Sequence, residues 1–184
     1  MQRSNYKHWR NSQELGATLF MTATCLDFAH LFGRREIREL MAKHLIESHL
    51  TYNARLHAFV VMTHHFHIIS SAPETRTCSW LMQKIKGEAT KLLNGQLLET
   101  ESAQTQMQVG LNDRQLWKRS FRGIPVQDER MMSDSIGYIH LNPVRAGYCE
   151  NPEQYRWSSA RLFQCGFYQV DYGFDLNKCL AEFS

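Results

Sequence analysis

Two short apolar segments, residues 56–62 and 65–71, are separated by only two residues, and this spacing constrains the fold more than any other feature of the chain. Both segments read as strands because they are rich in apolar, aromatic and β-branched residues. A two-residue connection is typical of a hairpin, so the two strands should be antiparallel. We therefore expect a sheet in which residues 65–71 form a central strand.

Strand and helix patterns alternate along the rest of the chain. The predicted order is strand 17–25, helix 35–50, strands 56–62 and 65–71, helix 77–93, strand 115–126 and helix 128–141. The helices are assigned because apolar side chains recur in them at helical spacing. This β-α-β-β-α-β-α order predicts an α+β protein with a ferredoxin-like antiparallel sheet, helices packed on one face, and a further C-terminal helix.

Turn-forming residues set the expected ends of the last two helices. Asn94-Gly95 should stop the second helix, and the polar residues 97–112 should form a loop. Asn142-Pro143 should end the third helix or distort its last turn, because a residue that precedes proline avoids the helical region.

Composition and charge fit one domain with a short appendage at each end. The chain has 184 residues, of which 43% are hydrophobic and 21% charged, close to ordinary globular usage. We expect residues 1–16 to form a basic arm, residues 17–147 the main domain, and residues 148–184 an aromatic tail packed on that domain. The formal net charge of +3 permits nucleic-acid binding without requiring it.

Cysteine usage and hydropathy exclude several classes of protein. The five cysteines are an odd number and none forms a Cys-x-x-Cys pair, which argues against a disulfide framework or a zinc ribbon and favours a reducing cytoplasm. No apolar run approaches the roughly 18 residues of a membrane span. The basic N-terminus is not followed by the apolar stretch of a secretory signal.

The histidines are unevenly distributed, since three of the nine lie at positions 64, 65 and 67. Alternate residues of a strand face the same way, so His65 and His67 share one face while Phe66 points to the other. Two imidazoles on one strand face provide half of a divalent-metal site. They could also simply line a solvated face of the sheet. His64 would point away from the pair if the strand begins that early.

A second candidate group lies in the last predicted helix. Tyr138 and Asn142 are four residues apart and therefore share one helix face. The tyrosine hydroxyl is a potential nucleophile, and the asparagine carboxamide oxygen could be a third metal ligand. Each residue also has an ordinary structural interpretation. Tyr138 could be a core ring with a satisfied hydroxyl, and Asn142 could cap the end of the helix.

The segments VVMTHHFHIIS and YIHLNPVRAG together resemble the single-tyrosine HUH transposases, in the branch of REP-associated tyrosine transposases. The resemblance covers about residues 17–160 and includes LWKRSF before the tyrosine and PEQYRWSS after it. It implies a ferredoxin-like fold. It also implies cleavage and rejoining of single-stranded DNA, beside hairpins of repeat elements, through a 5′-phosphotyrosine intermediate.

The resemblance further implies a role for individual residues. Tyr138 would be the catalytic nucleophile, with His65 and His67 as catalytic metal ligands for Mg²⁺ or Mn²⁺. Asn142 would occupy the third ligand position, where related insertion-sequence enzymes often have glutamine. Family members commonly have Met-Pro-Asn-His where this chain has Met-Thr-His-His at residues 62–65, which leaves His64 as an alternative ligand. The polar stretch after the second helix is longer than expected and could be a DNA-contacting loop or a neutral insertion.

Basic side chains that could follow a DNA strand occur throughout the chain. They are Arg3, Lys7 and Arg10 in the arm, Lys84, Lys86 and Lys91 on the second helix, Lys118, Arg119 and Arg122 near the fourth strand, and Arg145 after the tyrosine. Trp117 and Phe121 could stack bases, although burial is the ordinary role for at least one of them.

Two other functions fit the same residues. A non-catalytic module that binds single-stranded nucleic acid would use the basic and aromatic residues without any bond breaking. A small metal-dependent hydrolase would use the two histidines without forming a tyrosine adduct. A transposase-like protein could also serve its host by processing repeats rather than by moving an element, and it could act as a monomer or a homodimer.

Overall fold

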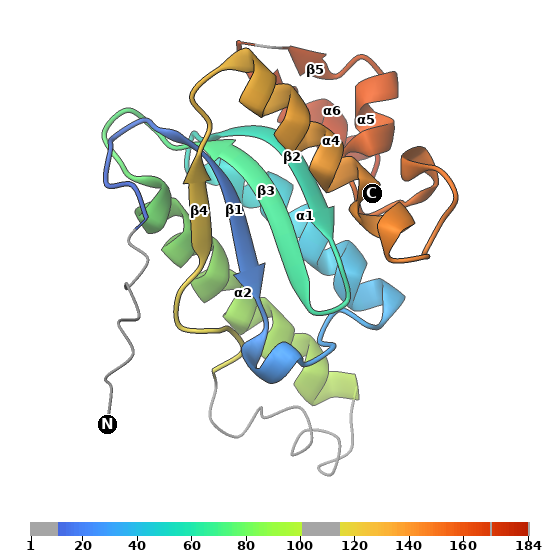
Figure 1. The fold of residues 1–184 in the computed structure, drawn as a ribbon. Coiled ribbons are helices and arrows are strands. Elements are labelled where there is room, and N and C mark those ends of the chain that lie inside the picture. Colours follow the sequence, from blue (N-terminus) through green and yellow to red (C-terminus); the bar gives the residue numbers. More distant parts are fainter. Residues whose placement is uncertain (1–10, 101–114, 170, 184) are drawn as a thin grey trace, which may run out of the picture.

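A four-stranded antiparallel sheet forms the centre of the molecule (Figure 1). The computed structural model describes residues 11–100, 115–169 and 171–183. The strands are β1 (Thr18–Thr24), β2 (Arg55–Val61), β3 (His65–Ser71) and β4 (Arg122–Pro125), in the order β2-β3-β1-β4. All neighbouring pairs are antiparallel. This is the ferredoxin-like arrangement, and the predicted fold class is confirmed.

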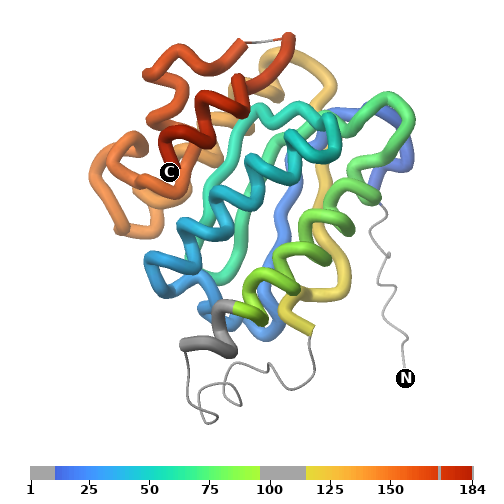
Figure 2. The backbone as a smooth tube through the Cα atoms, turned by 180° about the vertical axis from the view of Figure 1, so that it is seen from behind, coloured from blue at the N-terminus to red at the C-terminus, as the bar shows by residue number. Residues whose placement is uncertain are grey.

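Two long helices, α1 (Arg35–Thr51) and α2 (Cys78–Thr100), cover one face of the sheet (Figure 2). Alternate residues of the central strands face these helices, and the larger hydrophobic core lies between the two layers. Leu19 and Met21 of β1, Phe66 of β3, Leu45 of α1 and Ile85 of α2 are all fully buried in it. Burial of each such side chain stabilises the fold by about 1.5–3 kcal/mol.

Helix α4 (Glu129–Arg145) packs on the opposite face of the sheet (Figure 1). The side chain of Asp128 caps its first turn by accepting a hydrogen bond from the Met131 amide at 2.7 Å. Ile139 is fully buried against Val60 of β2 and Ile69 of β3 in a second, smaller core. Because Ile69 and His67 are two residues apart on β3, α4 crosses the same face of the sheet that carries the histidines.

Helices α2 and α4 both continue past the ends that the sequence predicted. Helix α2 runs through Asn94-Gly95 to Thr100, so the predicted stop is wrong. Gly95 does not adopt the left-handed conformation of a helix-ending glycine, and it therefore acts as an ordinary helical residue. Helix α4 runs through Pro143 to Arg145, so Asn142-Pro143 does not end it. Pro143 has no N–H and cannot donate the ordinary helical hydrogen bond to the carbonyl four residues earlier.

The segments between these two helices also differ from the prediction. The predicted loop 97–112 is helical up to residue 100, and its remaining residues lie outside the described part of the chain. The predicted strand 115–126 shortens to β4, preceded by a single bridge between Trp117 and Cys25. Within the described ranges, no helix is both long enough and apolar enough to cross a bilayer.

The C-terminal segment, residues 146–183, packs beside α1 and α4. It contains η3 (Pro152–Gln154), α5 (Ala160–Gln164), the hairpin of β5 (Tyr168–Gln169) and β6 (Gly173–Phe174), and α6 (Leu176–Ala181). Leu162, Phe174 and Phe183 are buried in the larger core. The segment therefore contributes apolar surface to the interior of the domain.

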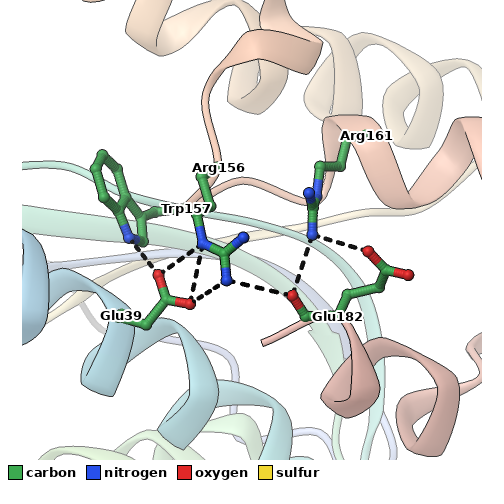
Figure 3. Close-up of polar contacts among 5 residues, drawn as sticks. All are labelled: Glu39, Arg156, Trp157, Arg161 and Glu182. Atoms are coloured by element: carbon green, nitrogen blue, oxygen red, sulfur yellow. Dashed lines mark hydrogen bonds and ion pairs between the residues drawn. The ribbon is translucent and has the colours of Figure 1, made fainter. Parts of the chain in front are cut away.

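A charged network ties this segment to α1 (Figure 3). Arg156 donates to Glu39 with an Nη2–Oε1 distance of 2.6 Å, and the Trp157 indole donates to the same carboxylate at 2.8 Å. Arg161 pairs with Glu182 at 2.9 Å. Partial burial acts to raise the pKa of Glu39, but the Arg156 and Trp157 hydrogen bonds outweigh it and hold that pKa below its ordinary value.

The buried His49 joins α1 to β3. Its Nδ1 lies 2.6 Å from the Leu45 carbonyl oxygen, which can only accept, so Nδ1 carries the proton. Its Nε2 therefore accepts from the Ser70 hydroxyl at 2.6 Å, and the ring is neutral. Burial lowers the pKa of His49 from 6.5 to about 4.

Acid should therefore destabilise the protein through His49. Between pH 6.5 and about 4 the unfolded chain binds a proton at this residue that the folded chain does not, so stability falls as the pH falls through that window. The expected loss is up to roughly 3 kcal/mol. Urea unfolding of wild type and His49→Gln at several pH values should show that the free energy of unfolding of the variant falls less steeply as the pH falls. The same pH dependence of the unfolding free energy in both proteins would contradict this account.

Candidate active site

Strands β1 and β3 and helix α4 bring the predicted tyrosine and histidines together on one face of the sheet. The Tyr138 and His67 ring centroids lie 5.7 Å apart, with the rings edge to face. Phe20 of β1 contacts both of these rings, at 5.8 Å from Tyr138 and 5.4 Å from His67. The His65 ring lies 4.7 Å from that of His67. A phenol and two imidazoles from distant parts of the sequence thus form one cluster.

The orientation of α4 sets the exposure of Tyr138. Ile139 is fully buried against the sheet, and its neighbour Tyr138 lies at the edge of that contact, with 45% of its surface exposed. The Arg145 guanidinium carbon lies 5.3 Å from the centroid of the Tyr138 ring. On the C-terminal segment, the Ser159 hydroxyl lies 2.9 Å from Nε2 of His140. Tyr138 is therefore neither inside the hydrophobic core nor across the sheet from the histidines.

Both histidines are held in the neutral form at neutral pH. His67 is 6% exposed, and burial, with a smaller contribution from His65, lowers the pKa of His67 to about 3. Burial and the neighbouring His64 lower the pKa of His65 to about 4. A neutral imidazole keeps a lone pair on one ring nitrogen, which is the form that binds a metal.

Thr22 fixes the orientation of the His67 ring. It lies opposite His67 in the antiparallel pairing of β1 with β3, and its Oγ1 is 2.7 Å from Nδ1 of His67. In the tautomer in which Nδ1–H donates to Thr22, the Nε2 lone pair remains available for a ligand. Sequence reasoning missed Thr22 and Phe20. Their two-residue spacing indicates that they share one face of a predicted strand. Only the register of β1 with β3 shows that this face is the one that carries the histidines.

An open cavity of about 780 Å³ adjoins the ring cluster. Its lining includes Tyr138 and His67, the cationic Lys118 and Arg122, the ring of Phe121 and one carboxylate, that of Asp134. Its volume falls in the range of ordinary ligand sites. The cavity therefore places cationic side chains and an aromatic ring around the same space as the candidate nucleophile.

His65 and His67, with ring centroids 4.7 Å apart, are a pair of side chains that could form part of a metal site. Among the described residues, no three His, Cys, Asp or Glu side chains are arranged to hold a metal ion. Further ligands would thus be amide, substrate or water oxygens, or would need a side chain to move. Asn142 lies one turn beyond Tyr138 and is half-buried, but in the described chain it is not among the residues that line the cavity. His64 is adjacent, with its ring centroid 4.5 Å from that of His65.

The other predicted DNA contacts are divided between several surfaces. Lys84 and Lys91 are exposed on α2, which covers the face of the sheet opposite Tyr138. Lys86 is half-buried and donates to the Lys118 carbonyl at 2.9 Å, and burial lowers its pKa. Lys86 and Arg119 line a second cavity of about 380 Å³. Arg3, Lys7 and Arg10 lie outside the described residues.

The two aromatic residues near β4 differ in burial. Trp117 is 6% exposed, and its indole nitrogen donates to the Lys86 carbonyl at 3.1 Å, so it belongs to the core. Phe121 is half-buried and lines both cavities. Phe121 therefore remains available for contact with a ligand.

Comparison with known protein families identifies the class of this protein. The family model described as "Transposase IS200 like" matches residues 25–142, which include both histidines and Tyr138. The chain belongs to this family and is a DNA-processing transposase. No curated protein sequence matches it.

Two solved structures are similar to the chain. One is the structure of a REP-associated tyrosine transposase bound to a REP hairpin, with 19% identity and a TM-score of 0.66 over 92% of this chain and 93% of that one. This likeness shows a shared fold over nearly the full length. The other is a candidate transposase from Deinococcus radiodurans, with 13% identity and a TM-score of 0.48 over 76% of this chain and 95% of that one.

Proposed function

We propose that this protein cleaves and rejoins single-stranded DNA through a covalent bond between Tyr138 and a 5′-phosphate, as a REP-associated tyrosine transposase. The observation that carries the proposal is the contact between the Tyr138 and His67 rings beside a cavity whose lining includes Lys118 and Arg122. Membership of the IS200-like family and the fold shared with a hairpin-bound transposase support it.

In the proposed reaction, the Tyr138 oxygen attacks the phosphorus in line with the bond to the departing 3′ oxygen. A bond forms between phosphorus and the tyrosine oxygen, the bond to the 3′ oxygen breaks, the phenol loses its proton, and the departing 3′ oxygen takes one up from water, so that there is no net change in protons. The products are a 5′-phosphotyrosine and a free 3′-hydroxyl. Because the phosphodiester energy is kept in the tyrosine ester, another 3′-hydroxyl can attack it and reseal the strand without ATP.

The residues around the cavity would position and neutralise the phosphate. Lys118 and Arg122 line the cavity, and Arg145 lies beside the Tyr138 ring, so all three could offset phosphate charge. A divalent cation bound by His65 and His67, Mg²⁺ or Mn²⁺, would supply further charge on the phosphoryl and departing oxygens. Asn142, or His64 as the alternative, would be a third ligand. The two neutral imidazoles of His65 and His67 are chemically suited to binding such a cation.

The proposed substrate is a single strand next to a DNA hairpin. The reacting phosphate must enter the cavity and face Tyr138, which requires backbone that is free of its complementary strand. The similar structure was solved with a REP hairpin, which supports a hairpin beside the cleaved phosphate in this case too. Arg3, Lys7 and Arg10 of the N-terminal arm and Arg119, Lys84, Lys86 and Lys91 remain proposed contacts for more distant phosphates.

Replacing the proposed nucleophile should abolish the covalent product. Tyr138 is 45% exposed, so Tyr138→Phe should fold normally. When wild-type protein is incubated with hairpin oligonucleotides and Mn²⁺, a denaturing gel should show a band that contains both protein and DNA. This band should be absent for Tyr138→Phe, whereas DNA affinity should stay within roughly threefold of wild type.

Tyr148→Phe is the matched control, because Tyr148 is another exposed tyrosine close to the β2–β3 turn. This variant should form the covalent band as wild type does. If the band persists in Tyr138→Phe, the assignment of the nucleophile is wrong. If wild-type protein binds the oligonucleotides and never forms the band, a non-catalytic binding module becomes the better description.

Removing the Thr22 hydroxyl should weaken metal binding. Thr22→Val leaves Nδ1 of His67 without its hydrogen-bond partner, and the loss of such a partner typically lowers metal affinity about 10–100-fold. Titration of Mn²⁺ followed by electron paramagnetic resonance should show this decrease. Thr18→Val, four residues earlier on the same face of β1, is the control, because its hydroxyl contacts Ser71 at 2.6 Å rather than a histidine, and it should bind Mn²⁺ like wild type. Equal affinities for the two variants would contradict a role for Thr22.

A further inference from the structure

The turn after β1, η1 (Leu26–Phe28), exposes an aromatic ring on an unfavourable backbone. Phe28 has 56% of its surface exposed. Asp27 and Phe28 both have positive φ, at 49° and 56°, in the left-handed region that bulky residues rarely adopt. None of the three residues of η1 is buried. Packing in the core does not explain why this turn keeps an exposed ring and two strained residues, and strained backbone of this kind often occurs at functional sites.

Phe28 is surrounded by cationic and imidazole side chains. The Lys118 ammonium nitrogen lies 3.3 Å from the centroid of the Phe28 ring. The His64 ring meets that of Phe28 edge to face at 5.8 Å, and the His30 ring lies 5.3 Å from that of His64. The surroundings of this ring are therefore suited to an anionic ligand that also has an aromatic part.

Lys118 connects Phe28 to the candidate active site. It lines the cavity that contains Tyr138 and His67, and its backbone amide donates to the Thr24 carbonyl at 2.9 Å. The Leu26 amide donates to the Leu116 carbonyl at 2.9 Å, so the turn is fixed to the segment that carries Lys118. Phe28 is not among the described residues that line the cavity, but it contacts Lys118, which is one of them.

We infer that Phe28 is a stacking platform for one unpaired base of the DNA strand, and that Lys118 neutralises the phosphate next to that base. An exposed ring beside a cation is the arrangement by which proteins bind single-stranded nucleic acid without reading its sequence. Bases in a duplex have both faces covered by their neighbours, so the platform selects a single strand. This inference rests on the proposed function, since it assigns a position to a nucleotide near the reacting phosphate.

Two other exposed aromatic residues are less suitable for this role. Tyr148 stacks on another aromatic ring, that of Tyr155, at 6.0 Å, whereas Phe28 contacts Lys118, a residue that lines the cavity. Tyr172 is 71% exposed but lies in the turn between β5 and β6. Figure 1 shows β5 at the end of the molecule opposite η1. Tyr172 is therefore a matched control, as an exposed ring away from the cavity.

The experiment measures stacking directly with 2-aminopurine, a fluorescent base that is quenched when it stacks. Single-stranded oligonucleotides with a hairpin, each with 2-aminopurine at one position flanking the cleaved phosphate, are bound to the Tyr138→Phe protein so that binding is observed without cleavage. At one position the protein should quench the fluorescence. Phe28→Ala should abolish this quenching and lower DNA affinity about tenfold. Phe28→Trp should retain both, and Tyr172→Ala should change neither.

A glycine variant separates stacking from a structural role. Glycine adopts positive φ without strain, so Phe28→Gly should unfold at the same or a higher temperature than wild type while its DNA affinity falls. A ring that only supported the fold would give a lower unfolding temperature in this variant. Wild-type affinity and wild-type quenching in Phe28→Ala would overturn the inference.

The same variants distinguish failure of this inference from failure of the proposed function. If the protein with Tyr138 intact forms the covalent adduct, but quenching at every position is unaffected by Phe28→Ala, then base stacking on Phe28 is wrong and the proposed covalent chemistry is supported. If quenching depends on Phe28 but no adduct ever forms, the platform is supported and the proposed chemistry is wrong.

Discussion

The antiparallel pairing of β1 with β3 is the interaction on which the candidate site depends. Its register places Thr22 opposite His67. Because side chains alternate between the faces of a strand, Phe20, Thr22, His65 and His67 then share the face that α4 covers. A shift of one residue would turn the histidines into the core beneath α1 and α2 and bring Phe66 to the surface. The buried residues of both strands, such as Met21 and Ile68, oppose that shift.

The position of the tyrosine depends on how α4 is held against the sheet. Ile139 is buried between α4 and strands β2 and β3. Ser159 lies 2.9 Å from His140 of α4 and also accepts from the Phe59 amide of β2. The C-terminal segment that carries Ser159 is in turn bound to α1 through Arg156 and Glu39 (Figure 3). Residues outside the elements that form the candidate site thus help to fix the direction from which Tyr138 approaches the histidines.

The sequence predicted the elements well where a local pattern decides them. Strand β3 begins and ends at the predicted residues, because its length and composition distinguish it from its neighbours. The end of α2 was predicted wrongly, because Asn94-Gly95 can end a helix or continue it and only the wider packing decides. The meeting of Tyr138 with His67 was expected from the family resemblance. The Thr22 contact and the exposed Phe28 depend on register and on backbone conformation, which a single sequence does not reveal.

The central claim is that His65 and His67 bind one divalent cation and that the Tyr138 hydroxyl lies next to it. Anomalous diffraction at the manganese edge, from crystals grown with Mn²⁺ and a single-stranded hairpin oligonucleotide, tests it most directly. Our account predicts one manganese peak bonded to His65 and His67, with a phosphate of the DNA between that peak and the Tyr138 oxygen. A peak elsewhere on the chain, or a phosphate bound on the face covered by α1 and α2, would contradict it.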